Sequence, residues 1–112
     1  MEDSILDTIK AMLGVNSTDV GFDTDILVAI NTAIGTLQQI GIGPTPTYSV
    51  ATKDQTWINY LPVIADYPNV KTYIYLKVKL MFDPPASATI LNAFQSQIAE
   101  LEFRLSISPT NL

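Results

Sequence analysis

Residues that commonly perform chemistry are few in this chain of 112 residues, and none of them forms a recognisable site. Histidine and cysteine are both absent, which excludes histidine-based triads, thiol nucleophiles and the common zinc sites. Asp19, Asp23 and Asp25 are spaced somewhat like the ligands of a calcium loop, but the glycine and the final glutamate of such a loop are missing. Helix capping explains Asp23 or Asp25 more simply. We therefore predict no metal site.

The two glutamates near the end of the chain do not form a catalytic pair either. Glu100 and Glu102 lie two positions apart on an expected helix, so their side chains point in different directions. Glu100 lies four residues before Arg104, and such a pair stabilises a helix by only about 0.2–0.5 kcal/mol. Gly41-Ile42-Gly43 follows a helix rather than a strand and lacks the third glycine of a dinucleotide-binding turn. We predict no catalytic residue, no cofactor and a protein that is not an enzyme.

Aromatic side chains are better candidates for function, because Trp, Tyr and Arg dominate the energetics of binding interfaces. Trp57 is the only tryptophan, and it suits either the core of the domain or an interface. Tyr73 and Tyr75 allow the same two interpretations. The interface gains weight for them because the segment around them is apolar on most sides.

The composition favours a subunit of an assembly. Apolar residues make up 47% of the chain and charged residues 15%, against about 25% charged in a typical soluble domain. A monomer of this composition would expose much apolar surface, which contact with neighbouring subunits would cover. No segment reaches the ~20 consecutive apolar residues of a membrane span. The acidic start, Met1-Glu2-Asp3-Ser4, fits neither a secretory signal nor a transit peptide.

The charge argues against tight DNA binding. Six Lys and Arg against eleven Asp and Glu give a net charge of −5. Lys71, Lys77 and Lys79 are the only local concentration of positive charge, whereas proteins that bind DNA neutralise its phosphates with basic clusters. We expect repulsion or indifference towards DNA, which would suit a channel through which DNA slides.

The sequence pattern predicts that the elements which position these residues are helices. We expect an all-α fold, a small bundle of four to five helices. An amphipathic helix over residues 3–13 is expected, capped by Asp3 or Ser4 and stopped by Gly14. Its apolar stripe consists of Ile5, Ile9 and Met12, with Leu6 and Leu13 beside it.

A second helix should begin after Asp23 or Thr24 and end at Ile40, with Gly41 as its stop. Its apolar stripe consists of Leu27, Ile30, Ile34 and Leu37.

Helical periodicity is lost over residues 41–53, where glycines and two prolines predict a loop. Loops of this length inside a compact domain are often functional. A short third helix is expected from Asp54 to Leu61 or Ile64, and Asn69 is expected to cap the next element.

Residues 70–80 fit two different structures. With a period of two, they place apolar and β-branched side chains on one face and lysines and tyrosines on the other, as in a half-buried strand. As a helix, the segment is apolar almost all round and must be enclosed on most sides. We favour a helix over 70–82, because the segment is long against a typical strand of ~5–6 residues. A strand would also need a partner, and the chain offers none.

A double proline separates this helix from the last one. Asp83-Pro84-Pro85 ends it, since proline disfavours the helical conformation at the residue before it. Ser87 should cap a final helix of about eighteen residues with a heptad seam. The seam consists of Leu91, Phe94, Ile98, Leu101 and Leu105. Residues 1–105 thus form one domain, and 106–112 form a polar, flexible tail that a partner would order.

Three stretches of the chain carry a family resemblance. They are Gly41-Ile42-Gly43-Pro44, Thr56-Trp57-Ile58-Asn59-Tyr60-Leu61, and the whole segment from Val70 to Leu105. The last contains Tyr75-Leu76-Lys77-Val78-Lys79-Leu80-Met81-Phe82-Asp83-Pro84-Pro85 and Glu100-Leu101-Glu102-Phe103-Arg104-Leu105. In their joint order these stretches resemble the small helical head–tail connector (adaptor, head-completion) proteins of tailed bacteriophages. Phe103 stands where that family commonly has tryptophan, and Met81 where it commonly has leucine.

The resemblance implies a structural virion protein that forms a ring, commonly of twelve copies, below the portal. Such a ring joins capsid to tail and extends the channel for double-stranded DNA, without specific DNA binding and without a membrane. The implied partners are further copies of the chain, the portal protein and a downstream neck or tail-completion protein. The implied location is the neck of the virion, after synthesis in the cytoplasm of the host bacterium.

Composition and position give three candidate surfaces for such a subunit. The candidates for the ring interface are Trp57, Tyr60, Tyr73, Tyr75, Leu76, Leu80, Phe82 and Phe103. The candidates for a loop that lines the channel or meets a neighbouring ring are Gly41, Gly43, Pro44, Pro46, Tyr48 and Lys53. The candidates for a tail that docks on the portal are Ile107, Pro109 and Leu112.

Two other functions stay open from the sequence. One is another neck or head-completion protein at a different level of the same stack. The other is a non-viral cytoplasmic adaptor that dimerises through the heptad seam of its last helix. A connector should be monomeric or ring-forming on its own, whereas such an adaptor should be a stable dimer.

Overall fold

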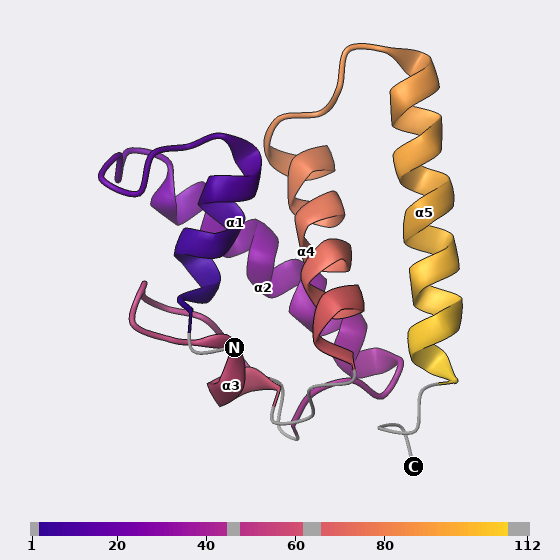
Figure 1. Ribbon diagram of the computed structural model, residues 1–112, viewed down its shortest axis with the longest axis horizontal. Coiled ribbons are helices and arrows are strands. Elements are labelled where there is room, and N and C mark those ends of the chain that lie inside the picture. Colours follow the sequence, from indigo (N-terminus) through magenta and orange to yellow (C-terminus); the bar gives the residue numbers. More distant parts are fainter. Residues whose placement is uncertain (1–2, 45–47, 62–65, 108–112) are drawn as a thin grey trace.

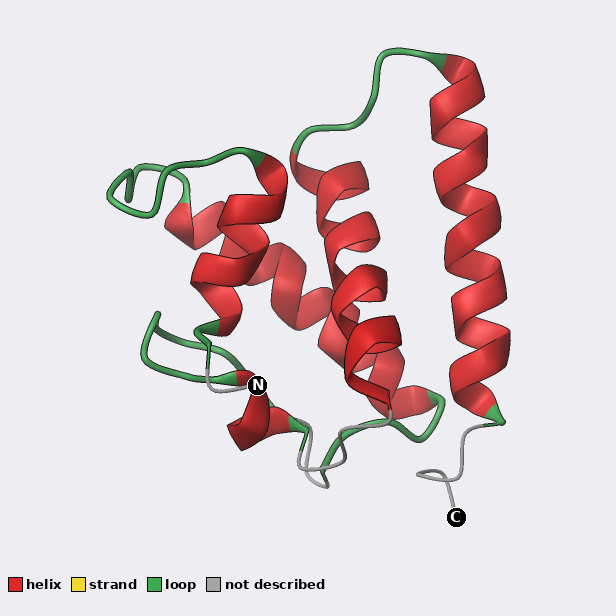
Figure 2. Cartoon of the chain, in the orientation of Figure 1, coloured by secondary structure: helices red, strands yellow, loops and turns green. Residues whose placement is uncertain are grey.

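The computed structural model describes residues 3–44, 48–61 and 66–107. Within these ranges the chain forms five helices and no strand, which confirms the predicted all-α class (Figures 1 and 2). The helices are α1 (Ile5–Leu13), α2 (Asp23–Gln39), α3 (Trp57–Tyr60), α4 (Tyr67–Phe82) and α5 (Ala88–Ser106).

Helix α4 is the centre of the bundle. It packs against α1 and α2 on one side and against α5 on the other (Figure 1). These neighbours supply the enclosure that a helix apolar almost all round requires, so the helical interpretation of 70–82 is confirmed. The buried residues of α4 are Val70, Tyr73, Ile74, Leu76 and Val78.

The beginning of α4 differs from the prediction. The helix starts at Tyr67 after Asp66, so Asn69 lies inside its first turn and is not its cap. Pro68 occupies the first turn, where a missing N–H costs nothing and the fixed φ of proline suits the helix. The proline therefore begins the helix, whereas the sequence reading placed it before the helix.

Helix α1 has the predicted ends. The Ser4 hydroxyl accepts a hydrogen bond from the Asp7 amide at 3.2 Å, and Gly14 closes the helix in the left-handed region with a φ of 81°. Ile5 and Ile9 are fully buried, as predicted, but Met12 lies at the exposed end of the helix and is 37% exposed.

Helix α2 ends at Gln39, one residue before the predicted end, and Gly41 follows with a φ of 99°. Its buried face is rotated slightly from the predicted stripe. Ile26 is fully buried and Leu27 only half-buried, because a face directed at both α1 and α4 is centred on Ile30 and Ile34. The buried residues are Ile26, Ala29, Ile30, Ala33, Ile34 and Leu37.

Helix α3 is a single turn, shorter than predicted, and Ile64 falls outside the described residues. The chain before α3 pairs with the chain before α1: the Ile5 amide donates to the Gln55 carbonyl at 3.0 Å, and the Trp57 amide donates to the Asp3 carbonyl at 3.2 Å. The Gln55 carbonyl is thereby bonded to the start of α1, whereas a helix that began at Asp54 would have used it for its own hydrogen bonds.

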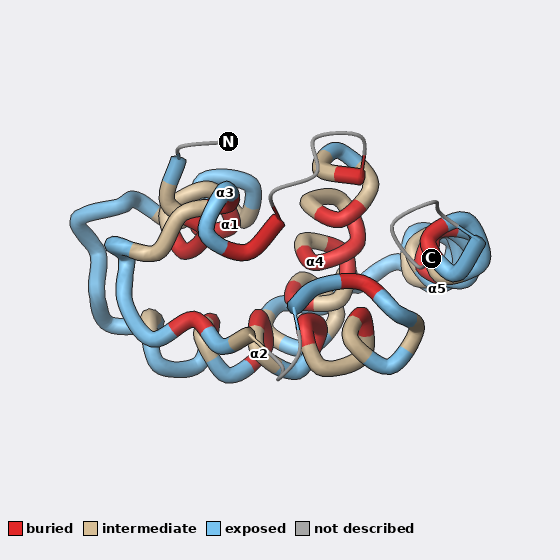
Figure 3. The backbone as a smooth tube through the Cα atoms, turned by 90° about the horizontal axis from the view of Figure 1, so that it is seen from below, coloured by how far each residue is buried: buried red, intermediate tan, exposed pale blue. Residues whose placement is uncertain are grey.

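Helix α5 lies along one side of the molecule. Its buried residues, Ile98, Leu101 and Leu105, occupy the side that faces α4 (Figure 3). Leu91 and Phe94, in the same heptad seam, are half-buried. The predicted cap is confirmed, since the Ser87 hydroxyl accepts from the Ile90 amide at 3.4 Å. The helix includes Ser106, so the predicted tail begins one residue later than expected.

Candidate assembly surfaces

Half of the predicted interface residues lie inside the subunit. Four are 3% exposed or less and belong to its hydrophobic core: Trp57, Tyr60, Tyr73 and Leu76. Three are half-buried against that core: Tyr75, Leu80 and Phe82. Phe103 is 66% exposed. Burial gives the first four a packing role within the subunit, and it leaves the other four within reach of a neighbour.

Trp57 joins α3 to α1 and α4. Its indole Nε1 donates a hydrogen bond to Thr8 Oγ1 at 3.1 Å, and its ring meets the ring of Tyr67 edge-on at 5.5 Å between centroids. Both the polar and the apolar part of the side chain are therefore satisfied within the subunit.

Tyr73 ties α4 to α5. Its hydroxyl donates to Glu102 Oε2 at 2.7 Å. Burial, then the hydrogen bond to Glu102 and the negative charge of that carboxylate, raise the pKa of Tyr73 above the ordinary tyrosine value. Glu102 thus serves the contact between two helices, whereas Glu100 pairs with Arg104 at the surface. The expectation that the two glutamates point in different directions is confirmed.

The loop over 41–53 begins close to Tyr60. Gly41 and Gly43 have φ values of 99° and 103°, where an L side chain is strained. A Cβ on Gly43 would lie 3.0 Å from the Tyr60 ring, so the glycine also allows the backbone to approach. Pro44 is exposed, and Pro46 lies outside the described residues. The Tyr60 hydroxyl has no hydrogen-bond partner among the described residues, and burial raises the pKa of Tyr60.

Two amide side chains fix the second half of this loop. Asn31 of α2 exchanges two hydrogen bonds with the backbone of Val50, donating to its carbonyl at 2.9 Å and accepting from its amide at 2.7 Å. Gln55 accepts from the amides of Ala51 and Thr52 and donates to the hydroxyl of Tyr48. Tyr48 is half-buried and stacks on Tyr60, while Lys53 is exposed at the tip.

A buried lysine holds the connection between α1 and α2, and the sequence reading did not identify it. The ammonium group of Lys10 contacts the Asp23 carboxylate at 2.8 Å and donates to the carbonyls of Asp19 at 2.7 Å and Ser17 at 3.2 Å. The side chain is 1% exposed. Of the three acidic residues that resembled a calcium loop, Asp23 binds this lysine with its carboxylate and Asp19 with its backbone carbonyl, whereas Asp25 lies on the other side of α2 at the surface. In the described part of the chain, no group of three or more acidic, His or Cys residues is placed to hold a metal.

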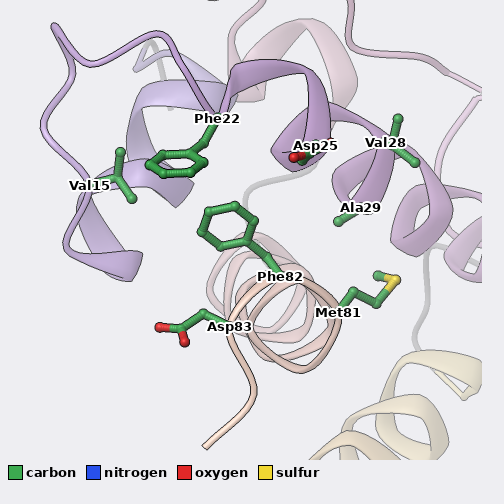
Figure 4. A pocket seen from close by; sticks show the side chains of 8 residues that line it. All are labelled: Val15, Phe22, Asp25, Val28, Ala29, Met81, Phe82 and Asp83. Atoms are coloured by element: carbon green, nitrogen blue, oxygen red, sulfur yellow. The ribbon is translucent and has the colours of Figure 1, made fainter.

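A groove of about 670 Å³ lies between the start of α2 and the end of α4 (Figure 4). Phe22 and Phe82 meet edge-on at 5.4 Å on one side of it. Apolar side chains remain accessible there: Phe22 is 47% exposed, Val28 63% and Met81 46%. The lining residues are Val15, Phe22, Asp25, Val28, Ala29, Met81, Phe82 and Asp83. We call this the α2–α4 groove.

A second accessible apolar surface lies on the outer side of α5. Phe103 is 66% exposed and Ile107 is 67% exposed, and the exposed Arg104 lies beside them. One turn earlier, Glu100 pairs with Arg104 at 2.7 Å. We call Phe103, Arg104 and Ile107 the α5 patch. The other predicted tail residues, Pro109 and Leu112, lie outside the described residues.

Positive charge is largely engaged within the subunit. Lys10 is buried, Lys79 pairs with Asp83 at 2.8 Å, Arg104 pairs with Glu100, and Lys71 lies 5.1 Å from the centroid of the Tyr67 ring. A surface without a basic cluster offers little to a phosphate backbone.

The chain matches the model of one protein family over residues 5–111, and that family is described as phage connector protein. Searches of curated proteins and of solved structures give no match. None of the helices in the described residues is long and apolar enough to cross a membrane. The family match extends over all five helices and both surfaces. The chain belongs to the phage connector protein family.

Proposed function

We propose that this protein is a structural subunit of a ring in the neck of a tailed phage. In this proposal, copies of the chain form a closed ring below the portal, join the capsid to the tail and extend the channel for the genome. The observation that carries it is the family match over residues 5–111. The apolar surface that a single copy leaves exposed supports it, because an assembly subunit must cover such surface.

The ring interface in this proposal uses residues that reach the surface of the folded subunit. Of the predicted candidates, Phe103 is the most accessible, and Tyr75, Leu80 and Phe82 are half-buried. The number of subunits in the proposed ring is twelve, as the family resemblance implies.

The loop over 41–53 is our candidate for the wall of the channel or for contact with a neighbouring ring. Its second half is held by Asn31 and Gln55, which would keep its exposed tip in a defined position. The net charge of −5 and the absence of a basic cluster among the described residues suit a wall along which DNA slides.

The tail after Ile107 is our candidate for docking on the portal. Deleting residues 108–112 leaves every residue of α5 in the chain, and far-UV circular dichroism checks that the shortened chain is folded. We expect it to lose co-sedimentation with purified portal rings. Unchanged co-sedimentation would exclude the docking role of this tail.

The location is tested by gold labelling of virions. A peptide tag is fused after Leu112 in one phage and before Met1 in a second, and infectivity controls for assembly. Gold at the junction of head and tail is expected in both. Absence of label from every particle of both infective phages would refute the assignment to the virion neck.

The alternative of a cytoplasmic dimer loses its main support. That dimer would use the heptad seam of α5, but Ile98, Leu101 and Leu105 already pack against α4 within one subunit. A stable dimer held by this seam would require α5 to leave α4. Sedimentation equilibrium separates the two functions: a connector should be a monomer or a ring, and the adaptor should be a dimer.

A further inference from the structure

We infer that the α5 patch of one copy docks in the α2–α4 groove of the next copy. The inference rests on the proposed ring and specifies the surfaces that would build it. The sequence did not pair these two surfaces, and it assigned Ile107 to the tail that docks on the portal, whereas this inference assigns it to the contact between copies. Only Phe103 and Phe82 were among the expected interface residues.

The two surfaces match in chemistry. The patch presents two apolar side chains that are each about two-thirds exposed, Phe103 at 66% and Ile107 at 67%. The groove presents apolar walls with Val28 at 63% and Met81 at 46% exposure. A projecting aromatic residue that enters a preformed apolar groove is the usual anchor of a protein interface.

Charge gives the contact a direction. Asp25 lines the groove, is exposed, and makes no ion pair or hydrogen bond to a described residue. Arg104 follows Phe103 at the exposed end of α5, and its present partner Glu100 is itself 58% exposed. An arginine can bind two carboxylates with its forked donors, so docking lets Arg104 reach Asp25 without leaving Glu100. The groove is therefore complementary to the patch rather than to a second groove.

The positions of the two surfaces exclude a contact within one copy. The groove lies at the C-terminal end of α4 and the patch at the C-terminal end of α5 (Figure 1). The two helices run in opposite directions, and the sixteen residues of α4 span about 24 Å at the usual rise per residue. The patch can reach only the groove of another copy. A contact between two different surfaces repeats from copy to copy and closes as a ring or continues as a filament.

Cysteine cross-linking tests this contact, because the chain has no cysteine of its own. Val28→Cys places a thiol at the groove, and Ala99→Cys places one on α5 one turn before Phe103, which stays in place as the anchor; both positions are exposed. Equal amounts of the two variants are mixed and treated with a short bismaleimide. The matched control replaces Ala99→Cys by Ile58→Cys, at an exposed site on α3 that belongs to neither surface.

We expect at least a tenfold higher yield of dimer from Val28→Cys with Ala99→Cys than from the control pair. Adding Arg104→Glu to the Ala99→Cys chain should remove most of that excess, and Asp25→Arg in the Val28→Cys chain should restore it. A chain that carries both cysteines should give a ladder of oligomers, in solution and in virions.

Two results would overturn the inference. A yield equal to that of the control pair would mean that the surfaces meet only by collision. Preferential cross-linking of Ala99→Cys to itself would mean a symmetric contact between two α5 helices. Gold label at the neck together with either result would reject this contact and leave the connector function standing.

Discussion

At the scale of single residues, the Lys10 cluster shows how a charged side chain can be structural in this subunit. Its ammonium group is removed from water but receives a carboxylate and two carbonyls in exchange. A buried pair of this kind adds little compared with well-packed apolar residues, yet breaking it is costly because the remaining groups stay unpaired. The cluster also fixes the loop that carries Phe22 to the α2–α4 groove.

Replacing Lys10→Met keeps the length of the side chain and removes its charge. We expect the free energy of unfolding to fall by about 3 kcal/mol, the lower end for a broken buried pair, because Asp23 is partly accessible to water. Urea unfolding followed by circular dichroism measures the change. Lys79→Met is the matched control: it breaks an exposed pair with Asp83 and should cost about 0.5 kcal/mol or less. Equal losses in the two variants would refute a special role of the Lys10 cluster.

Tyr73 predicts how stability depends on pH. The pKa of Tyr73 is raised in the folded state, so the unfolded chain loses this proton first as the pH rises. The stabilisation is complete below the ordinary tyrosine value of about 10 and declines above it. We expect the urea concentration at the midpoint of unfolding to decrease as the pH is raised from 9 to 11, and to decrease less in Tyr73→Phe. The same slope in both proteins would contradict this assignment.

At the scale of elements, the backbone conformation decides which glycines are required. Gly14 has a φ of 81°, and Gly35 lies inside α2; a Cβ would meet no atom within 4 Å at either position. A methyl group would therefore clash with no neighbour at either position, and the two glycines differ only in their backbone conformation.

Alanine at these two glycines should act in opposite directions. Gly14→Ala should destabilise the protein by about 1 kcal/mol, because the left-handed region disfavours a Cβ. Gly35→Ala should stabilise it by about 0.5–1 kcal/mol, because alanine loses less backbone freedom in a helix. Thermal unfolding of both variants tests the pair. A shift in the same direction would mean that contacts with neighbours, not backbone conformation, set the effect.

Some ends of elements were predictable from the sequence because they depend on local chemistry, whereas the starts of α3 and α4 were not. Ser4, Gly14 and Ser87 act as expected, since each cap involves residues within one turn. The pattern of 70–80 gave no such answer, because what decides it is enclosure by α1, α2 and α5, which are distant in sequence. For the same reason, the sequence pattern did not show that Ile26, rather than Leu27, lies on the buried face of α2.

At the scale of the whole molecule, the candidate site was only partly predictable. Exposure of Phe103 followed from its place opposite the heptad seam, and burial of Trp57 did not, because its pattern allowed both positions. The α2–α4 groove depends on how the end of α4 meets the start of α2, more than fifty residues away along the chain. No local pattern marks that meeting.

The last prediction concerns how firmly α5 is held on α4. Among the described elements, α5 packs extensively only on α4, whereas α2 contacts both α1 and α4 in the core. Elements with few buried contacts open at lower free energy than the core. In hydrogen exchange followed by mass spectrometry, we expect the amides of 98–105 to exchange faster than those of 26–37.

A substitution in the seam shows whether α5 opens on its own. Leu101→Ala should cost about 2 kcal/mol of contact with α4, at the low end for a core leucine because Leu101 is 9% exposed. Exchange in 98–105 should accelerate by about 30-fold, since 1.4 kcal/mol corresponds to tenfold. Exchange in 26–37 should change little. An equal acceleration in both segments would mean that the subunit opens as one unit. An acceleration confined to 98–105 would mean that α5 opens on its own. Helix α5 would then be the part of the subunit that contact with a neighbouring copy can stabilise most.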